Sequence, residues 1–267
     1  MKDGFMKYGA DGERPEAYVS NPRSSHPSGQ VIVIHEVWGF TPFIQRVCER
    51  LSHSGFLAVA PLLYWRDKEL FSPTTLREGL DAVWDLSLEE RYRPAKLAAA
   101  MREKRPSKEA ESMLKVLYDM GFRKRILQDV TSLADSLKTQ SAHPRIGVLG
   151  FSMGGKLAIQ LAAGFPGLLA CVAYSAKPAD SATVKRIQCP VQLFYGKDDL
   201  FMTRDLPEFV KDSMRNAAEL ALKIYPQAGH EFFDETNRGY QAAAAMDAWG
   251  ETVDFFRRKL SGKDVKS

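Results

Sequence analysis

Short, mostly apolar runs recur along the chain and predict strands buried in a sheet. They cover residues 31–34, 56–61, 146–149, 168–174, 191–195 and 220–225. Between the first two runs, Phe43, Val47 and Leu51 recur at helical spacing after Pro42, and Gly55 ends the helix that they predict. Strands that alternate with amphipathic helices predict an α/β domain with a mostly parallel sheet flanked by helices.

The remaining periodic segments extend this pattern towards both ends of the chain. Residues 5–20 predict an edge hairpin with a turn at 10–12 and a strand at 16–19. Further helices are predicted over 125–138 and 156–163, and near the C-terminus, where one face carries Met246, Trp249, Val253, Phe256 and Leu260. At 267 residues, of which 45% are hydrophobic, the chain is expected to form one domain over 1–267.

One segment, at about 66–124, interrupts the alternation of strands and helices. Helical patterns cover 74–87, 94–104 and 107–121, and no convincing strand pattern occurs among them. We interpret this segment as a helical cap inserted into the α/β domain.

Charge is unevenly distributed and bears on possible partners. Residues 91–125 contain eleven Lys or Arg and four Asp or Glu, whereas the whole chain carries a formal charge of +4. Apolar residues at helical spacing interrupt this basic run, which favours the solvated face of helices over a nucleic-acid surface. No nucleic-acid or membrane partner is therefore expected, and the oligomeric state is left open.

Cysteine usage and the N-terminal residues indicate a cytoplasmic protein. Cys48, Cys171 and Cys189 are odd in number and fall in apolar patterns, so we expect buried thiols in a reducing compartment rather than a disulfide framework. Residues 1–7 lack the apolar core of a signal peptide, and no stretch is long and apolar enough to span a membrane. No histidine, cysteine or acidic cluster has metal-site spacing, and no cofactor is expected.

Candidate chemistry begins at Gly150-Phe151-Ser152-Met153-Gly154, which joins a predicted strand to a predicted helix. In that context Gly-x-Ser-x-Gly predicts a nucleophile elbow, with Ser152 at the apex of a sharp turn. The same residues begin a phosphate-binding pattern, Gly-x4-Gly-Lys, but Leu157 stands where that pattern needs Ser or Thr. A nucleophilic Ser152 is therefore the better interpretation.

A serine nucleophile needs a base and an acid that orients the base, and both follow later strands. Asp198 and Asp199 follow the run at 191–195, and His230 follows the run at 220–225. The order serine, acid, histidine is that of α/β-hydrolases. Spacing alone leaves Asp198 and Asp199 as alternatives for the acid.

The loop after the first buried strand supplies the remaining candidates. An acyl-transfer site needs two donors for the oxyanion, and we expect the backbone N–H groups of Met153 and of Val37 or Trp38. Glu36 in the same loop is expected near Ser152, either as an auxiliary carboxylate that affects the nucleophile or as a structural group bonded to the loop. Trp38 and Tyr64 are expected to shape the acyl pocket.

In combination, these motifs resemble the dienelactone hydrolase family of α/β-hydrolases. The resemblance rests on residues 31–39, 60–64, 150–155, 195–199 and 225–232 and on the aromatic final helix. It implies an α/β-hydrolase fold. It also assigns the role of the acid to Asp199 and that of the auxiliary carboxylate to Glu36. Ser152 stands where the family typically has cysteine, and Asp234 stands where the enzymes that act on dienelactone carry a basic residue. The segment at 66–124 is also longer than the family's usual one.

The sequence thus predicts a serine-dependent hydrolase of carboxylic esters or lactones that acts through an acyl-enzyme on Ser152, with a small-molecule ester or lactone as its partner. Within the same fold, other acyl-transfer or carbon–halogen chemistry is an alternative. From a different class, the alternative is a non-catalytic scaffold that binds a ligand or partner through its basic segment.

Overall fold

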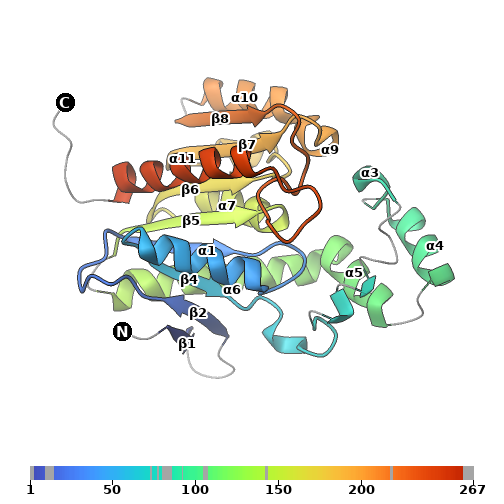
Figure 1. The fold of residues 1–267 in the computed structure, drawn as a ribbon, viewed down its shortest axis with the longest axis horizontal. Coiled ribbons are helices and arrows are strands. Elements are labelled where there is room, and N and C mark those ends of the chain that lie inside the picture. The colour runs from blue at the N-terminus through green and yellow to red at the C-terminus, as the bar shows by residue number, and fades with distance from the viewer. Residues whose placement is uncertain are drawn as a thin grey trace.

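The computed structural model describes residues 3–9, 15–72, 74–76, 78–79, 86–91, 93–104, 108–141, 144–216 and 219–260. Its centre is an eight-stranded sheet (Figure 1). The strands are β1 Gly4–Lys7, β2 Glu16–Ser20, β3 Gln30–Ile34, β4 Leu57–Pro61, β5 Ile146–Phe151, β6 Leu168–Tyr174, β7 Val191–Gly196 and β8 Leu220–Tyr225. Each predicted strand is present.

The order of the strands places a change of direction at the middle of the sheet. The order is β1-β2-β4-β3-β5-β6-β7-β8. From β4 to β8 all neighbours are parallel, whereas β1 and β2 form an antiparallel edge beside β4. The chain leaves β3 for β4 on one side and returns to β5 on the other, so the carboxyl ends of β3 and β5 flank a topological switch point, where ligands bind in open α/β sheets.

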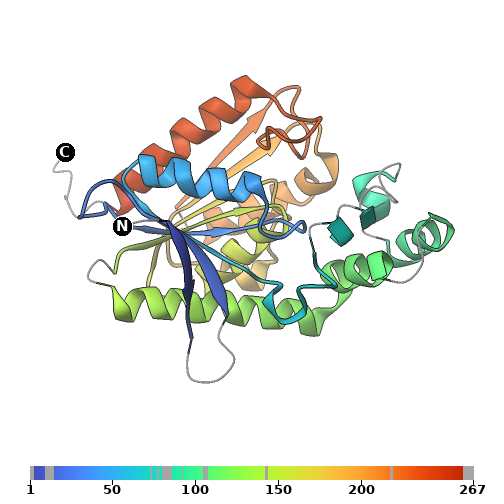
Figure 2. The same cartoon turned by 60° about the horizontal axis from the view of Figure 1, so that its bottom comes forward.

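Helices cover both faces of the sheet (Figures 1 and 2). One face packs against α1 Pro42–His53 and α11 Ala242–Leu260. The other packs against α6 Met120–Gln140, α7 Met153–Gly164, α8 Ser181–Val184 and α10 Leu206–Arg215, and the short α9 Leu200–Thr203 follows β7. This three-layer arrangement explains why the central strands read as continuous apolar runs.

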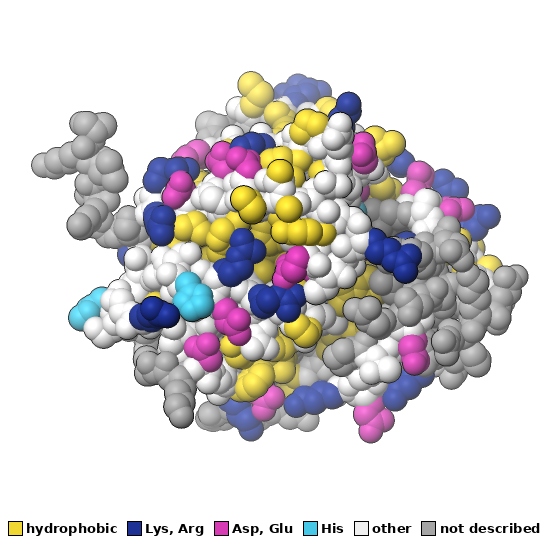
Figure 3. Space-filling view, in the orientation of Figure 1, with side chains coloured by type: hydrophobic (Ala, Val, Ile, Leu, Met, Phe, Trp, Pro, Cys, Tyr) yellow, Lys and Arg dark blue, Asp and Glu magenta, His cyan; other side chains and the backbone are white. Residues whose placement is uncertain are grey.

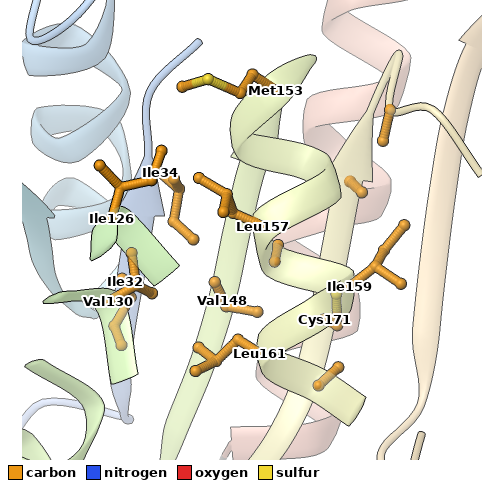
Figure 4. Close-up of a cluster of buried hydrophobic side chains, with 14 of the residues drawn as sticks. Ile32, Ile34, Ile126, Val130, Val148, Met153, Leu157, Ile159, Leu161 and Cys171 are labelled. Carbon is orange, nitrogen blue, oxygen red and sulfur yellow. The ribbon is translucent and has the colours of Figure 1, made fainter. Parts of the chain in front are cut away.

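Aliphatic side chains from the sheet, α6 and α7 pack together in the part of the core that Figure 4 shows. Ile32 and Ile34 of β3 lie near Ile126 and Val130 of α6, and Val148 of β5 lies beside α7. Successive residues of a strand face opposite sides, so Val31 and Val33 enter the second core, with α1 and α11. This packing fixes α7, and with it the turn that precedes the helix.

The segment between β4 and α6 is helical where it is described. It contains a 3₁₀ turn at Trp65–Asp67, α3 Leu88–Arg91, α4 Pro94–Lys104 and α5 Lys108–Tyr118. Leu97, Met113 and Leu117 form a small core of their own, against which Val37 and Trp38 pack. The predicted helix at 74–87 is seen at 74–76 and 78–79, and residues 77 and 80–85 lie outside the described residues.

Some predicted boundaries differ from the structure. The helices predicted at 107–121 and 125–138 are divided at Asp119 instead, because its side chain accepts a hydrogen bond from the Phe122 N–H and caps α6. Met246 of the final helix is exposed rather than packed with Val253 and Leu260. The predicted hairpin turn at 10–12 lies outside the described residues.

On the face shown in Figure 3, basic and acidic side chains are interspersed, with apolar side chains between them. Cys48, Cys171 and Cys189 are buried free thiols. Within the described ranges, the chain has no helix with the length and apolar character needed to cross a bilayer.

Candidate active site

Ser152 occupies the sharp turn between β5 and α7. Its backbone has φ 50° and ψ −111°, a conformation that costs a non-glycine residue about 1–3 kcal/mol. The Ser152 N–H donates to the Tyr174 carbonyl of the neighbouring strand at 2.8 Å, which helps to hold the turn. The hydroxyl is thereby presented at the carboxyl end of the sheet.

Two glycines allow this turn to form. A Cβ on Gly150 would lie 2.2 Å from the Gly154 carbonyl oxygen, and a Cβ on Gly154 would lie 2.3 Å from the Ile34 carbonyl oxygen. Both distances are far below van der Waals contact with backbone atoms that cannot move freely. The close approach of Gly154 to Ile34 also sets the elbow directly against the loop that follows β3.

The structure brings Ser152, His230 and Asp199 together in one hydrogen-bonded chain. The His230 Nε2 lies 2.9 Å from the Ser152 Oγ, and the His230 Nδ1 lies 2.7 Å from the Asp199 Oδ2. A carboxylate only accepts, so Nδ1 carries the proton and Nε2 is free to accept one from the hydroxyl. Asp199, which bonds to His230, is buried, whereas Asp198 is exposed, and this favours Asp199 of the two acids that spacing left open.

Ser175, directly after β6, supports this arrangement and was not identified from the sequence. Its φ is 46°, its N–H donates to the Phe194 carbonyl at 2.8 Å, and its hydroxyl donates to the His230 carbonyl at 2.8 Å. Ser175 therefore ties the backbone of the histidine to the sheet. Its position one residue past a predicted strand, at the same edge as Ser152, is the signal that could have found it.

The two predicted oxyanion donors lie on either side of the elbow. Met153 is the first residue of α7, where backbone N–H groups have no partner within the helix. Val37 lies in the loop after β3, which turns through Gly39 at φ 79° and is closed by the Gly39 N–H donating to the Glu36 carbonyl at 3.3 Å. Since β3 and β5 are neighbours, both donors stand at one end of the sheet.

Tyr64 and Trp38 hold this loop in place through contacts with the protein core. The Tyr64 hydroxyl donates to the Val37 carbonyl at 3.0 Å, and its ring packs against Phe71 and Phe122. Trp38 packs between the main core and the small core of the helical segment. Neither side chain is among the described residues that line the two cavities reaching Ser152. The predicted role of these residues in the acyl pocket therefore has no direct contact to support it.

His35 fixes the start of the same loop. Its side chain is fully buried, and its Nδ1 donates to the Glu36 carbonyl at 2.6 Å. Burial lowers the pKa of His35 to about 4, so the ring is neutral at pH 7. Within the described residues, no group of three or more His, Cys, Asp or Glu side chains is arranged to hold a metal ion.

Glu36 lies on a small cavity of about 20 Å³ that also reaches Ser152 and His230. This volume suits one water molecule. The Glu36 side chain is 8% exposed, and its Oε1 has no hydrogen-bond partner among the described residues. Burial, reinforced by the charges of Asp234 and Glu231, raises the pKa of Glu36 well above its usual value. The cavity beside the serine therefore favours the uncharged form of this carboxyl group.

Two further carboxyl groups line the same cavity. Burial raises the pKa of Glu231 and of Asp234. Asp234, at the position where a basic residue was expected from the family, accepts hydrogen bonds from the Thr236 N–H and from Asn237 at 2.8 Å each. These bonds join Asp234 to the residues that follow it in the same loop. With Glu36 and Glu231, Asp234 also makes this side of Ser152 acidic.

A larger cavity of about 360 Å³ opens on the opposite side of Ser152. Apolar residues of α6 and α7 form much of its wall, and four cations also line it, namely Arg123, Lys124, Lys156 and Lys177. The sequence placed Arg123 and Lys124 on a solvated helix face, offered Lys156 only as the lysine of the rejected Gly-x4-Gly-Lys pattern, and did not indicate Lys177. Lys156 stands one helical turn after Ser152, which is the pattern that could have identified it.

Comparisons with known proteins identify the family of this chain. The model of the dienelactone hydrolase family matches residues 16–260. A protein of Saccharolobus solfataricus, provisionally named carboxymethylenebutenolidase, is 32% identical over 254 residues, which cover 94% of this chain and 96% of that protein.

Solved structures show the same fold. A protein of Klebsiella pneumoniae, provisionally named dienelactone hydrolase, has a TM-score of 0.72 at 23% identity, over 96% of this chain and 99% of that one. A dienelactone hydrolase of Anabaena variabilis has a TM-score of 0.67 at 17% identity, over 97% and 98% of the two chains. The predicted α/β-hydrolase fold is confirmed, and the chain belongs to the dienelactone hydrolase family.

Proposed function

We propose that this chain is a serine-dependent hydrolase of carboxylic esters or lactones. The observation that carries the proposal is the chain of hydrogen bonds from Asp199 through His230 to Ser152, at 2.7 Å and 2.9 Å, with the serine on a strained elbow. A neutral histidine that is oriented by a buried carboxylate is the base that a serine hydroxyl needs.

The first half of the reaction forms an acyl-enzyme. The His230 Nε2 takes the proton of the Ser152 hydroxyl as the oxygen attacks the acyl carbon, and negative charge develops on the carbonyl oxygen. The N–H groups of Met153 and Val37 donate to that oxygen. When the intermediate collapses, the bond between the acyl carbon and the alcohol oxygen breaks, and His230 returns its proton to the leaving alcohol. In a lactone the alcohol stays attached to the acyl group.

The second half releases the acid. His230 takes a proton from water, the hydroxyl oxygen attacks the acyl carbon, and the Ser152 oxygen leaves with the proton. The cavity of about 20 Å³ between Ser152, His230 and Glu36 supports this step, because it offers room for one water molecule beside the ester bond. Every group in these steps belongs to the chain, to the substrate or to water.

Labelling with a fluorophosphonate tests the proposal directly. The reagent forms a Ser–O–P bond and loses fluoride only when the serine is activated, so intact mass and peptide mapping should show one adduct, on Ser152. We expect His230→Ala to abolish the adduct. His53→Ala, at an exposed histidine in the last turn of α1, is the matched control and should label as the wild type does.

The opposite outcome would replace the mechanism. If folded wild-type protein acquires no adduct and hydrolyses no ester or lactone, Ser152 is not an activated nucleophile. The chain would then be a non-catalytic scaffold that binds a ligand.

A further inference from the structure

The cavity of about 360 Å³ beside Ser152 has an apolar wall and a basic lining. Ser152 and Met153 are among its lining residues, so a molecule in this cavity reaches both the proposed nucleophile and one proposed oxyanion donor. Ile126, Leu127 and Leu157 contribute apolar surface. The volume falls within the range of small-molecule sites, and an apolar chain with a charged end matches such a lining.

The cations come from three elements that meet at the carboxyl edge of the sheet. Arg123 and Lys124 belong to the first turns of α6, Lys156 belongs to the first turn of α7, and Lys177 follows β6. The described residues that line this cavity include no Asp or Glu. The potential inside it is therefore positive, in contrast to the carboxyl-lined cavity on the other side of Ser152.

Only part of this positive charge is compensated within the protein. Lys177 pairs with Asp205 at 3.6 Å and lies over the Phe201 ring. Arg123 uses its Nε to donate to the Val116 carbonyl at 3.1 Å, and it has no carboxylate partner among the described residues. No hydrogen bond or ion pair joins the Lys156 ammonium group to a described residue, and Asp180 is the acid whose charge reaches it.

Lys156 is held in an unfavourable environment when the cavity contains no anion. Partial burial lowers its pKa, and repulsion from Arg123 and Lys177 lowers it further, against the opposing charge of Asp180. Half-buried cations that repel one another are stabilised by an anion placed between them. Lys124 also has no carboxylate partner among the described residues, but it is exposed to solvent. The two half-buried cations without such a partner, Arg123 and Lys156, correspond to two negative charges.

We infer that this cavity binds the acyl part of an ester whose far end carries a dianion of the phosphate or phosphonate type, held between Arg123 and Lys156. The inference rests on the proposed function, because it assigns the acyl chain of the ester cleaved at Ser152 to this cavity. Lys156 lies four residues after Ser152, and its N–H donates to the Ser152 carbonyl at 3.1 Å. One helical turn rises about 5.4 Å, which a spacer of about three methylene groups spans.

Three p-nitrophenyl esters with the same three-methylene spacer test the inference. They are the 4-phosphonobutanoate, the glutarate hemiester with a terminal carboxylate, and the neutral pentanoate. We expect kcat/KM to be at least about tenfold higher for the phosphonate than for the pentanoate, with the glutarate between them, because contacts between opposite charges in a partly buried site are stronger than contacts between neutral groups.

Two variants and a control locate the effect. Lys156→Gln and Arg123→Gln should each reduce the ratio of kcat/KM for phosphonate over pentanoate by about tenfold. Lys138→Gln changes the charge by the same amount in the last turn of α6, where Lys138 lies over the Phe165 ring and outside the cavity lining, and should leave the ratio unchanged.

A binding measurement separates this inference from the proposed chemistry. Calorimetry on Ser152→Ala with the phosphonate ester needs no turnover, and we expect binding that weakens as salt is added and is about tenfold weaker when Lys156→Gln is combined with it. If the three esters are hydrolysed equally and Ser152→Ala does not bind the phosphonate, the inference is wrong and the proposed function stands. If no ester is hydrolysed but Ser152→Ala binds the phosphonate, the anion site stands and the proposed function fails. Equal kcat/KM for glutarate and phosphonate would overturn the assignment of a dianion.

Discussion

The two sides of Ser152 differ in the sign of their charge. On one side, Glu36, Glu231 and Asp234 line a cavity of about 20 Å³ and have raised pKa values. On the other, Arg123 and Lys156 line a cavity of about 360 Å³ and lack carboxylate partners among the described residues. The acidic side has room for water and the basic side for an organic anion, so under the proposed function the contrast would orient a substrate on the serine before any bond forms.

The largest effect is expected from the one carboxylate of this region that bonds to His230. Asp199→Asn should lower kcat/KM for an uncharged p-nitrophenyl ester by about 10³–10⁴-fold, because the amide no longer selects the histidine tautomer whose Nε2 accepts a proton. Steady-state hydrolysis at pH 8 measures the effect, and circular dichroism verifies folding.

Asp234→Asn is the matched comparison on the acidic side. It retains an oxygen that can accept from Thr236, so we expect a change in kcat/KM of less than about tenfold. Equal losses in the two variants would mean that the acidic cluster, and not Asp199 alone, orients His230.

The next effect concerns the protonation of Glu36. Its folded pKa is raised, so the folded state keeps a proton that the unfolded state loses above about pH 4.3. Stability therefore decreases as pH rises from there towards the raised pKa, by at most about 1.4 kcal/mol per pH unit. Glu36→Gln removes this dependence.

Denaturant unfolding of the wild type and of Glu36→Gln from pH 5 to pH 8 measures the difference. The free energy of unfolding of the variant should increase relative to that of the wild type as pH rises. Curves that run parallel across this range would show that Glu36 has the same proton affinity in both states, and the acidic side would then carry a charged carboxylate.

A smaller effect is expected where the oxyanion loop is supported. Tyr64→Phe leaves the Val37 carbonyl without its hydroxyl donor and should reduce the free energy of unfolding by about 1 kcal/mol. Because Val37 also offers an N–H to the oxyanion, kcat should fall as well, by a few fold.

Tyr195→Phe provides the control for this loop. The Tyr195 hydroxyl also donates to a backbone carbonyl, that of Ala176, at 2.7 Å. The Tyr195→Phe variant should lose about as much free energy of unfolding as Tyr64→Phe, but its kcat should not change. If both variants retain full kcat, Val37 is not positioned by Tyr64.

The smallest effect is expected on the basic side. Lys156→Met keeps the apolar stem and removes a charge that Arg123 and Lys177 repel, so stability at pH 7 should rise. Lys156 is only partly buried, and solvent screening limits the gain to about 0.5 kcal/mol. The pKa of Lys156 is lowered in the folded state, so the unfolded wild-type chain binds more protons than the folded one. The difference in stability between Lys156→Met and the wild type should therefore narrow as pH rises towards about 10.4. A loss of stability would mean that Lys156 has a favourable partner.

The sequence was sufficient for features that depend on local pattern. The run at 146–149, the two glycines and the following helix predicted the elbow, because each requirement lies within a few residues of Ser152. Asp119 as the start of α6 was missed, since its capping role depends on a side-chain bond that a break in periodicity does not reveal. The predicted helices therefore placed residues 120–121 in the preceding helix and residues 122–124 in neither, whereas α6 contains all five.

Features that depend on how the helices pack against one another could not be predicted from the sequence. Helical spacing indicates that Arg123 lies off the apolar stripe, but it does not indicate that this face of α6 meets α7 beside Ser152. Similarly, Tyr64 follows a strand as a pocket residue would, yet its hydroxyl is directed to the Val37 carbonyl. Both placements are set by packing between segments that are distant in the chain.

The positive φ of Ser152 has a consequence for how this chain responds to selection. Glycine adopts that conformation without a steric cost, and relief of about 1–3 kcal/mol of strain exceeds the roughly 0.5–1 kcal/mol that glycine loses through its freer unfolded chain. A selection for thermal stability alone, with no assay of turnover, would therefore replace the nucleophile by glycine. Under the proposed function, serine at position 152 is a residue that the fold accommodates at a cost and that the chemistry requires.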